Sequence, residues 1–192
     1  MSVMSDKYKF FFVHIEKNAG TSICSMFKKL DKVEYLKDFK FRGTKVYGSV
    51  RATDYIDYFG DHKWDEYFSF CFVRNPWDRM VSWFSYLQRH KNPPKNFKKW
   101  LKEYNFKGNE IQTNYFMTDK NKILVDFVGK FENLKNDFDK VLEKIGLSND
   151  KKLTIENTSK HKPYVEYYDD ESKNIIKSRC FKEIEMFNYR FD

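Results

Sequence analysis

The sequence predicts an α/β fold with a central, mainly parallel sheet flanked by helices. Two short and almost wholly apolar runs, residues 10–15 and 67–73, indicate buried strands. Each run stops abruptly at charged residues and is followed by an amphipathic helical pattern. Strands that alternate with helices form parallel sheets, and ligands of such sheets bind beyond the carboxyl ends of the strands.

The expected elements follow from apolar periodicity and from the residues that begin and end helices. Gly60 ends one helix, Pro76 begins another, and acidic residues open the last one. We expect strands at 8–15, 67–73 and 123–128, and helices at 21–30, 53–59, 76–90, 95–104, 109–117, 134–145 and 169–187. Residues 148–163 read as a polar loop.

The composition suits one domain that spans residues 1–192. Of the 192 residues, 41% are hydrophobic and 19% aromatic, so a substantial core is available. No apolar run approaches the ~20 residues of a membrane span, and the first residues lack the apolar core of a signal peptide. We therefore expect a soluble, cytoplasmic chain. The three cysteines show no C-x-x-C spacing, which favours buried free thiols, and we expect no metal.

The first strand leads into the segment His-Ile-Glu-Lys-Asn-Ala-Gly-Thr-Ser at residues 14–22. A tight turn and a helix N-terminus are expected here, with Lys17 at the mouth. N–H groups and the positive dipole end at such a terminus attract phosphate or sulfate. Lys17 precedes Gly20, so this is not the loop G-x-x-x-x-G-K-[ST]. An anion site is the leading interpretation, and an ordinary turn with Thr21 or Ser22 as helix cap is the alternative.

The second strand leads into Phe-Val-Arg-Asn-Pro-Trp-Asp-Arg-Met-Val-Ser at residues 72–82. Arg74 emerges at the strand end, where a guanidinium group can hold a phosphate through two N–H groups. Ser82 falls two helical turns into the next helix. In the alternative interpretation, Arg74 only pairs with Asp78 and Ser82 is a small packing residue.

Together the two segments resemble the PAPS-dependent sulfotransferases, in particular the branch that contains the carbohydrate sulfotransferases. That family carries a 5′-phosphosulfate loop H-x-x-K-x-A-G-T-S and a 3′-phosphate motif F-x-R-N-P-x-x-R-x-x-S, which match residues 14–22 and 72–82. Residues 129–134 and 164–169 also look like the family, so the resemblance spans most of the chain. It implies a three-layer fold like that of the P-loop NTPases.

The resemblance also implies a reaction and a set of site residues. The protein would move the sulfuryl group of PAPS to a hydroxyl of an oligo- or polysaccharide and release PAP. Lys17 would stabilise charge near the bridging oxygen, and Arg74 and Ser82 would hold the 3′-phosphate. The cofactor-binding residues would be Lys17, Asn18, Ala19, Gly20, Thr21, Ser22, Arg74, Ser82, Ser159 and Lys160, the last two in a loop that closes over the cofactor in relatives.

The sequence does not identify which residue acts as the general base. Many relatives place a histidine in a segment H-A-x-x-R, and the best match here has Tyr47 at that position. A tyrosine with a pKa near ~10 is a poor base at neutral pH. Glu16 and His14 are the substitutes beside the catalytic Lys17, although a histidine in a buried strand is commonly structural. His62 and His161 are weaker candidates.

Other functions remain as alternatives. The first is a protein that binds PAP or PAPS with lost or weak catalytic activity. A second is a nucleotide phosphotransferase, which would need a magnesium-binding carboxylate. The net charge of +8 favours an anionic partner, but the sequence carries no recognisable nucleic-acid module, so we expect no nucleic acid. The sequence does not fix the oligomeric state.

Overall fold

The computed structural model describes residues 2–35, 40–41, 44–45, 50–106, 108–147 and 161–192. They form two compact units, each built from two stretches of chain. The first unit comprises Met1–Val73 and Asn114–Asn157, and the second comprises Arg74–Thr113 and Thr158–Asp192. That the whole chain is a single domain remains a prediction.

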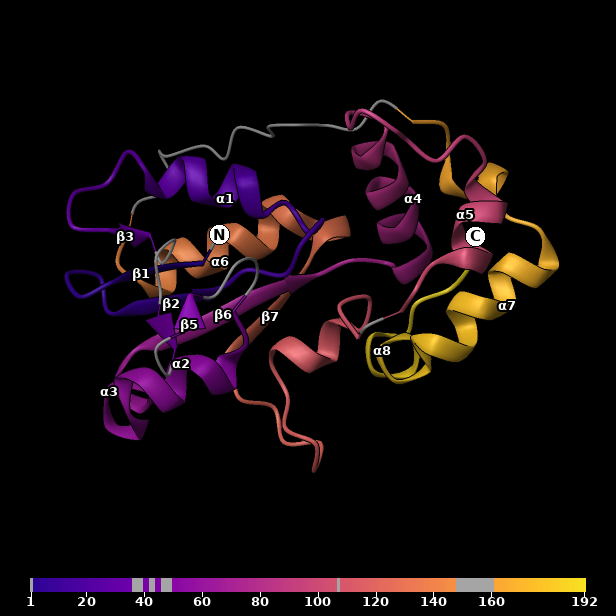
Figure 1. Ribbon diagram of the computed structural model, residues 1–192. Helices are drawn as coiled ribbons and strands as arrows, with labels where there is room; N and C mark the ends of the chain where they lie inside the picture. Colours follow the sequence, from indigo (N-terminus) through magenta and orange to yellow (C-terminus); the bar gives the residue numbers. More distant parts are fainter. Residues whose placement is uncertain (1, 36–39, 42–43, 46–49, 107, 148–160) are drawn as a thin grey trace. The chain divides into compact units, whose positions relative to one another are not determined.

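A five-stranded sheet forms the centre of the first unit, with strand order β3-β1-β2-β6-β7 (Figure 1). The middle is parallel, because β6 pairs parallel with both β2 and β7, whereas β1 pairs antiparallel with β2 and β3. A separate antiparallel pair joins β4 to β5. The strands are β1 (Val3–Ser5), β2 (Phe10–Val13), β3 (Glu34–Tyr35), β4 (Lys40–Phe41), β5 (Thr44–Lys45), β6 (Phe68–Val73) and β7 (Phe127–Lys130).

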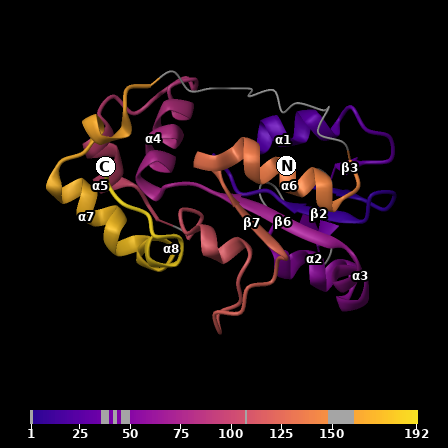
Figure 2. The ribbon, with the colours of Figure 1, turned by 180° about the vertical axis from the view of Figure 1, so that it is seen from behind.

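Helices cover both faces of the five-stranded sheet, which both ribbon views show (Figures 1 and 2). One face carries α1 (Gly20–Phe27) and α6 (Leu134–Lys144), and the other carries α2 (Ala52–Phe59) and α3 (Asp61–Glu66). Alternate side chains of β2 pack against the helices on the two faces of the sheet. Phe10 and Phe12 join the cluster with α1 and α6, whereas the Phe11 ring lies 5.1 Å from that of Trp64. The predicted three-layer α/β class is confirmed.

Parts of the first unit differ from the prediction. The short strand β1, which lies between β3 and β2, and the helix α3 were not expected. The strand expected at 123–128 begins only at Phe127, because the residues before it are held by side chains. The Asp126 carboxylate accepts hydrogen bonds from the N–H and hydroxyl of Ser69, at 2.7 and 2.9 Å. Trp64 Nε1 donates to the carbonyl of Leu124 at 3.0 Å.

The second unit is helical and has an aromatic core. Its helices are α4 (Pro76–Leu87), α5 (Phe97–Glu103), α7 (Asp170–Arg179) and α8 (Phe181–Phe187), and a 3₁₀ turn lies at Tyr164–Tyr167. A second 3₁₀ turn, Gln112–Tyr115, begins in this unit and ends in the first. The core gathers Trp77, Met80, Val81, Phe97, Leu101, Ile176, Cys180 and Ile184. The helix expected at 169–187 is divided at Cys180, which is buried. Within the described part of the chain, no helix combines the length and the apolar character needed to cross a bilayer.

Candidate functional site

The loop after β2 is built around two left-handed residues. β2 is buried throughout, and the chain leaves the sheet at half-buried His14 and reaches α1 at Gly20. Lys17 has φ 69° and Ala19 has φ 61°, and such conformations cost side-chain-bearing residues about 1–3 kcal/mol each. Tight turns that contain left-handed residues form backbone concavities that bind anions. The local backbone therefore has the character that the sequence predicted.

A close approach explains why residue 20 is a glycine. A Cβ atom on Gly20 would lie 1.9 Å from Cδ2 and 2.0 Å from Nε2 of His14. The imidazole of His14 thus lies against the first residue of α1. The backbone N–H of His14 donates to Ser2 Oγ at 3.4 Å. This contact gives His14 a structural role in shaping the loop, which was the alternative to its being a general base.

Asn18 ties the loop to the neighbouring strand. Its side chain is 1% exposed, and its Nδ2 donates to the carbonyl oxygen of Phe72 in β6 at 2.7 Å. Lys17 and Ala19, on either side, are half-buried. Because a buried amide that donates to a strand carbonyl has a fixed place, the residues flanking Asn18 are fixed with it.

The N-terminus of α1 carries the main-chain N–H groups of the first helical turn and the positive end of the helix dipole. The first hydrogen bond of this helix runs from the Ile23 N–H to the Ala19 carbonyl at 3.1 Å, so the N–H groups before it are directed out of the helix end. The first turn contains no acidic residue, and the positive end of the helix dipole is therefore not offset there. The Thr21 side chain is exposed, whereas Ser22 is 1% exposed.

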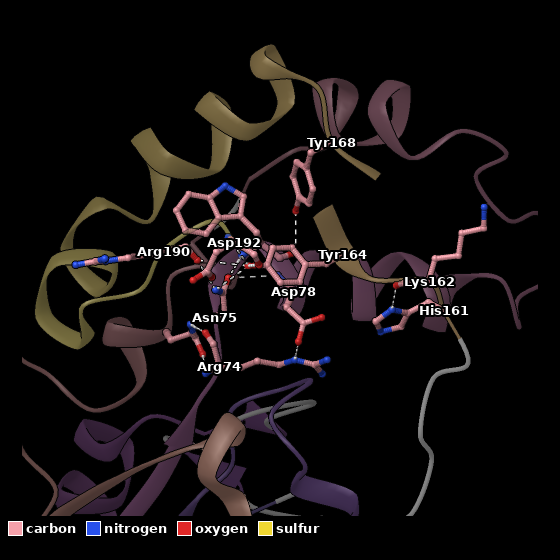
Figure 3. A network of polar contacts seen from close by, with 11 residues as sticks. Arg74, Asn75, Asp78, His161, Lys162, Tyr164, Tyr168, Arg190 and Asp192 are labelled. Carbon is pink, nitrogen blue, oxygen red and sulfur yellow. Dashed lines mark hydrogen bonds and ion pairs between the residues drawn. The ribbon is translucent and has the colours of Figure 1, made fainter. Parts of the chain in front are cut away.

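The turn after β6 holds Arg74 in a different way. The strand ends at Val73, and Asn75 caps α4 by accepting from the N–H of Trp77 at 3.1 Å. Arg74 Nε donates to Asp78 Oδ2 at 2.7 Å, and the two side chains are only 8% and 18% exposed (Figure 3). The Arg74–Asp78 pair considered as the alternative is therefore present. A guanidinium group has five N–H donors, and the bond to Asp78 is made by Nε.

A polar network surrounds the start of α4 (Figure 3). Asn75 Nδ2 donates to the carbonyl of Arg190 at 2.8 Å, and the hydroxyl of Tyr164 donates to the carbonyl of Asp192 at 2.8 Å. The Tyr168 hydroxyl donates to the carbonyl of Trp77 at 2.8 Å, and burial raises the pKa of Tyr168 well above its usual value. The family-like stretch at 164–169 thus supports the helix that follows Arg74.

Arg79 was not assigned a role from the sequence. It is 1% exposed, and its Nη1 and Nη2 donate to the carbonyls of Glu110 and Asn109 at 2.7 and 3.0 Å. Its position on the buried face of α4, beside Met80 and Val81, was the available signal, because a buried arginine must satisfy its donors. Ser82, three residues along the helix, is 4% exposed.

The remaining predicted residues are distributed as follows. The structure brings residues 14–22 together in one turn of the first unit, with Glu16 half-buried, while Arg74 and Ser82 belong to the second unit. Ser159, Lys160 and Tyr47 lie outside the described residues. His62 is exposed and lies 3.7 Å from Glu66, and His161 Nδ1 lies 2.8 Å from the carbonyl oxygen of Lys162.

The described part of the chain contains neither a cluster of metal-ligating side chains nor an exposed cysteine. Among the residues that the structure describes, no group of three or more histidine, cysteine, aspartate or glutamate side chains could hold a metal ion. The three cysteines, Cys24, Cys71 and Cys180, are free and buried, as expected. Burial raises the pKa of Cys24 to about 11 and those of the other two well above the usual value.

Known proteins resemble this chain in fold and in sequence. A mouse sulfotransferase, SULT7A1, whose crystal structure was determined as a complex with PAP, shares the fold at a TM-score of 0.57. The match has 13% sequence identity and covers 94% of this chain and 85% of that chain. An uncharacterized protein of Archaeoglobus fulgidus is 38% identical over 99 residues, which are 46% of this chain and 75% of the relative. A model described as the sulfotransferase family matches residues 1–190, and the chain belongs to that family.

Proposed function

We propose that the protein transfers the sulfuryl group of PAPS to a hydroxyl acceptor. The observation that carries the proposal is a pair of cationic residues beyond the carboxyl ends of two neighbouring parallel strands. Lys17 follows β2 and Arg74 follows β6, and Val13 and Cys71 are register partners near those ends. Ligands of parallel sheets bind at this edge, and both residues match positions of the family motifs.

Two sets of residues have the chemistry that the two ends of this donor require. The loop at 16–22 offers Lys17, the N-terminus of α1 and no acidic residue in the first helical turn, which suits the 5′-phosphosulfate. Arg74 and Ser82 are proposed to bind the 3′-phosphate, since a guanidinium group matches phosphate geometry. The PAP in the SULT7A1 complex supports this choice of donor.

Bound PAPS supplies an activated sulfuryl group. Lys17 holds the negative charge that develops at the 5′ end, as preorganised cations do in the related transfer of phosphoryl groups. Glu16, next to it in the loop, takes the proton of the acceptor hydroxyl. His14 is the weaker candidate for this base because its ring lies against Gly20.

The proposed acceptor class is a saccharide hydroxyl, which the resemblance to the carbohydrate branch supports. Aromatic residues that could stack on sugar rings have other roles in the described part of the chain. Trp100, Tyr164 and Tyr167 pack around the core of the second unit, and Tyr115 is 5% exposed. The acceptor must therefore be identified by assay: transfer from PAPS to a panel of oligosaccharides, steroids and phenols, with preference for saccharides expected.

The donor site is tested by calorimetry with PAP and with 5′-AMP, which lacks the 3′-phosphate. We expect the wild type to bind PAP more tightly. Arg74→Ala should lose about 10–150-fold in PAP affinity, because hydrogen bonds to charged groups contribute about 1.5–3 kcal/mol, and should keep its affinity for 5′-AMP. Exposed Arg89→Ala is the matched control. Unchanged PAP affinity in Arg74→Ala would remove the proposed 3′-phosphate site.

Two other outcomes would replace the proposal as a whole. Binding of PAP without transfer to any acceptor would favour a binding protein that has lost its chemistry. Stabilisation against heat by ATP and magnesium in preference to PAP would favour a nucleotide phosphotransferase.

The general base is tested by the pH–rate profile of Glu16→Gln. If Glu16 takes the proton, the rate should fall by about 10²–10⁴-fold and the acidic limb of the profile should disappear. Glu143→Gln, a change of an exposed residue on α6, is the matched control. A variant with the full rate and the wild-type profile would exclude Glu16.

A further inference from the structure

The main chain of Arg74 is held by a buried glutamine. Gln112 Oε1 accepts from the Arg74 N–H at 2.9 Å, and Gln112 Nε2 donates to the Arg74 carbonyl at 2.8 Å. Gln112 is 0% exposed. A single carboxamide therefore makes both bonds that a neighbouring strand would make, directly after the last residue of β6, where its pairing with β7 ends at Val73 and Lys130.

Gln112 is itself held in place by a buried carboxylate. Glu183 Oε2, from α8, accepts from the Gln112 N–H at 2.7 Å, and Glu183 is 0% exposed. Burial raises the pKa of Glu183, and the nearby Arg79 guanidinium and the Gln112 amide act in the opposite direction. A carboxyl group can be buried in such a place because it has these partners.

The chain just before Gln112 is fixed as well. Arg79 donates to the carbonyls of Asn109 and Glu110, and Cys180 Sγ donates to the Glu110 carbonyl at 3.9 Å. Groups from α4 and from the Cys180 turn thus fix the approach to Gln112, so that its carboxamide has one orientation. These contacts all lie within the second unit.

We propose that Gln112, held by Glu183, is a positioning residue for the 3′-phosphate. By fixing both main-chain polar groups of Arg74, Gln112 sets the direction in which the Arg74 side chain leaves the backbone. The bond to Asp78 then fixes the guanidinium end of that side chain. A misaligned Arg74 guanidinium group forms fewer hydrogen bonds to a phosphate. Loss of Gln112 should therefore lower the selectivity for PAP over 5′-AMP and not only the stability of the protein. This inference rests on the proposed function.

The test is the ratio of PAP to 5′-AMP affinity in Gln112→Met, which keeps the shape of the side chain and removes both bonds to Arg74. The ratio should fall roughly tenfold, KM for PAPS should rise by a similar factor, and kcat should change by less than about threefold. Glu183→Gln, which retains an acceptor for the Gln112 N–H, should leave the ratio within about twofold of the wild type.

The control for stability is Ser172→Ala, which removes a buried capping contact of α7 in the same unit. It should lower the melting temperature and leave the ratio unchanged. If Gln112→Met does not fold, Gln112→Glu replaces it, because its carboxylate accepts from the Arg74 N–H but cannot donate to the Arg74 carbonyl. The ratio of PAP to 5′-AMP affinity in Gln112→Glu should fall severalfold.

Two failures are distinguishable. A wild type with no preference for PAP over 5′-AMP would overturn the proposed function. A wild type that prefers PAP, together with folded Gln112 variants that retain the full preference, would overturn the positioning role alone.

Discussion

The two strand ends fix their cationic residues by opposite means. Around Lys17 most of the contacts are local, since His14 lies against Gly20 and the backbone itself is left-handed, and one long-range bond joins Asn18 to the carbonyl of Phe72. Around Arg74 they are distant, since Gln112 is 38 residues away and Glu183 lies 71 residues beyond Gln112. The first geometry is encoded largely in one short segment and its bond to β6, whereas the second depends on contacts spread through the second unit. Substitutions should therefore separate the two regions.

Among the substitutions that compare the two cationic residues and their supports, the largest effect is expected from Lys17→Ala, which removes the cation of the loop after β2. Loss of one preorganised charge-stabilising group costs about 10²–10³-fold in rate, so kcat should fall by this factor. PAP affinity should change much less. Sulfuryl transfer from PAPS measures the rate, with exposed Lys29→Ala as control. Activity within a few-fold of the wild type would show that Lys17 has no catalytic role.

The next largest effect is expected from Gly20→Ala, which tests the contact between His14 and the loop. Gly20→Ala should destabilise the protein by about 1–3 kcal/mol, because the added Cβ would overlap the imidazole. Combining it with His14→Ala removes the overlap, so the double variant should be more stable than the sum of the single losses predicts. Urea unfolding measures all three. Strictly additive losses would mean that the ring does not exclude the Cβ.

A smaller effect is expected from Asp78→Asn. This change removes the partner of Arg74 and a negative charge in the first turn of α4. Unfolding free energy should fall by about 0.5–1 kcal/mol. Selectivity for PAP should fall less than in Arg74→Ala, since Gln112 still holds the main chain. Thermal unfolding and calorimetry measure the two quantities. A complete loss of selectivity would assign the positioning of Arg74 to Asp78 rather than to Gln112.

The smallest effect is a pH dependence of stability at the buried carboxylate. Burial raises the pKa of Glu183 above its usual 4.5, so the folded chain retains a proton that the unfolded chain has released. The stabilisation that this retained proton gives the folded chain is fully present below pH 4.5, and it is lost as pH rises through the pKa of Glu183 in the folded chain. Glu183→Gln removes it, so the variant should gain stability relative to the wild type as pH rises from 4.5 through the folded pKa of Glu183. A constant difference in melting temperature would contradict this assignment.

The predictable parts of the molecule are those with local causes. The aromatic run at 10–13 and the turn at 14–22 could be read from neighbouring residues, and the structure has the expected strand and helix start there. β1 is only three residues long, too short for a periodic pattern. Gln112 and Glu183 carry no sequence signal, because a polar residue in a helical or turn pattern normally faces solvent. Their role follows from long-range packing alone.

The path of the chain also has a consequence during synthesis. β6 pairs with β2 on one side and with β7 on the other, but much of the second unit is translated between β6 and β7. On the ribosome, β6 therefore emerges with its second edge open until Phe127–Lys130 follow. An open edge of aromatic and apolar residues is a template for wrong pairing between nascent chains. Slow translation of residues 74–126 would prolong that exposure, whereas chaperones that cover strand edges would shorten it.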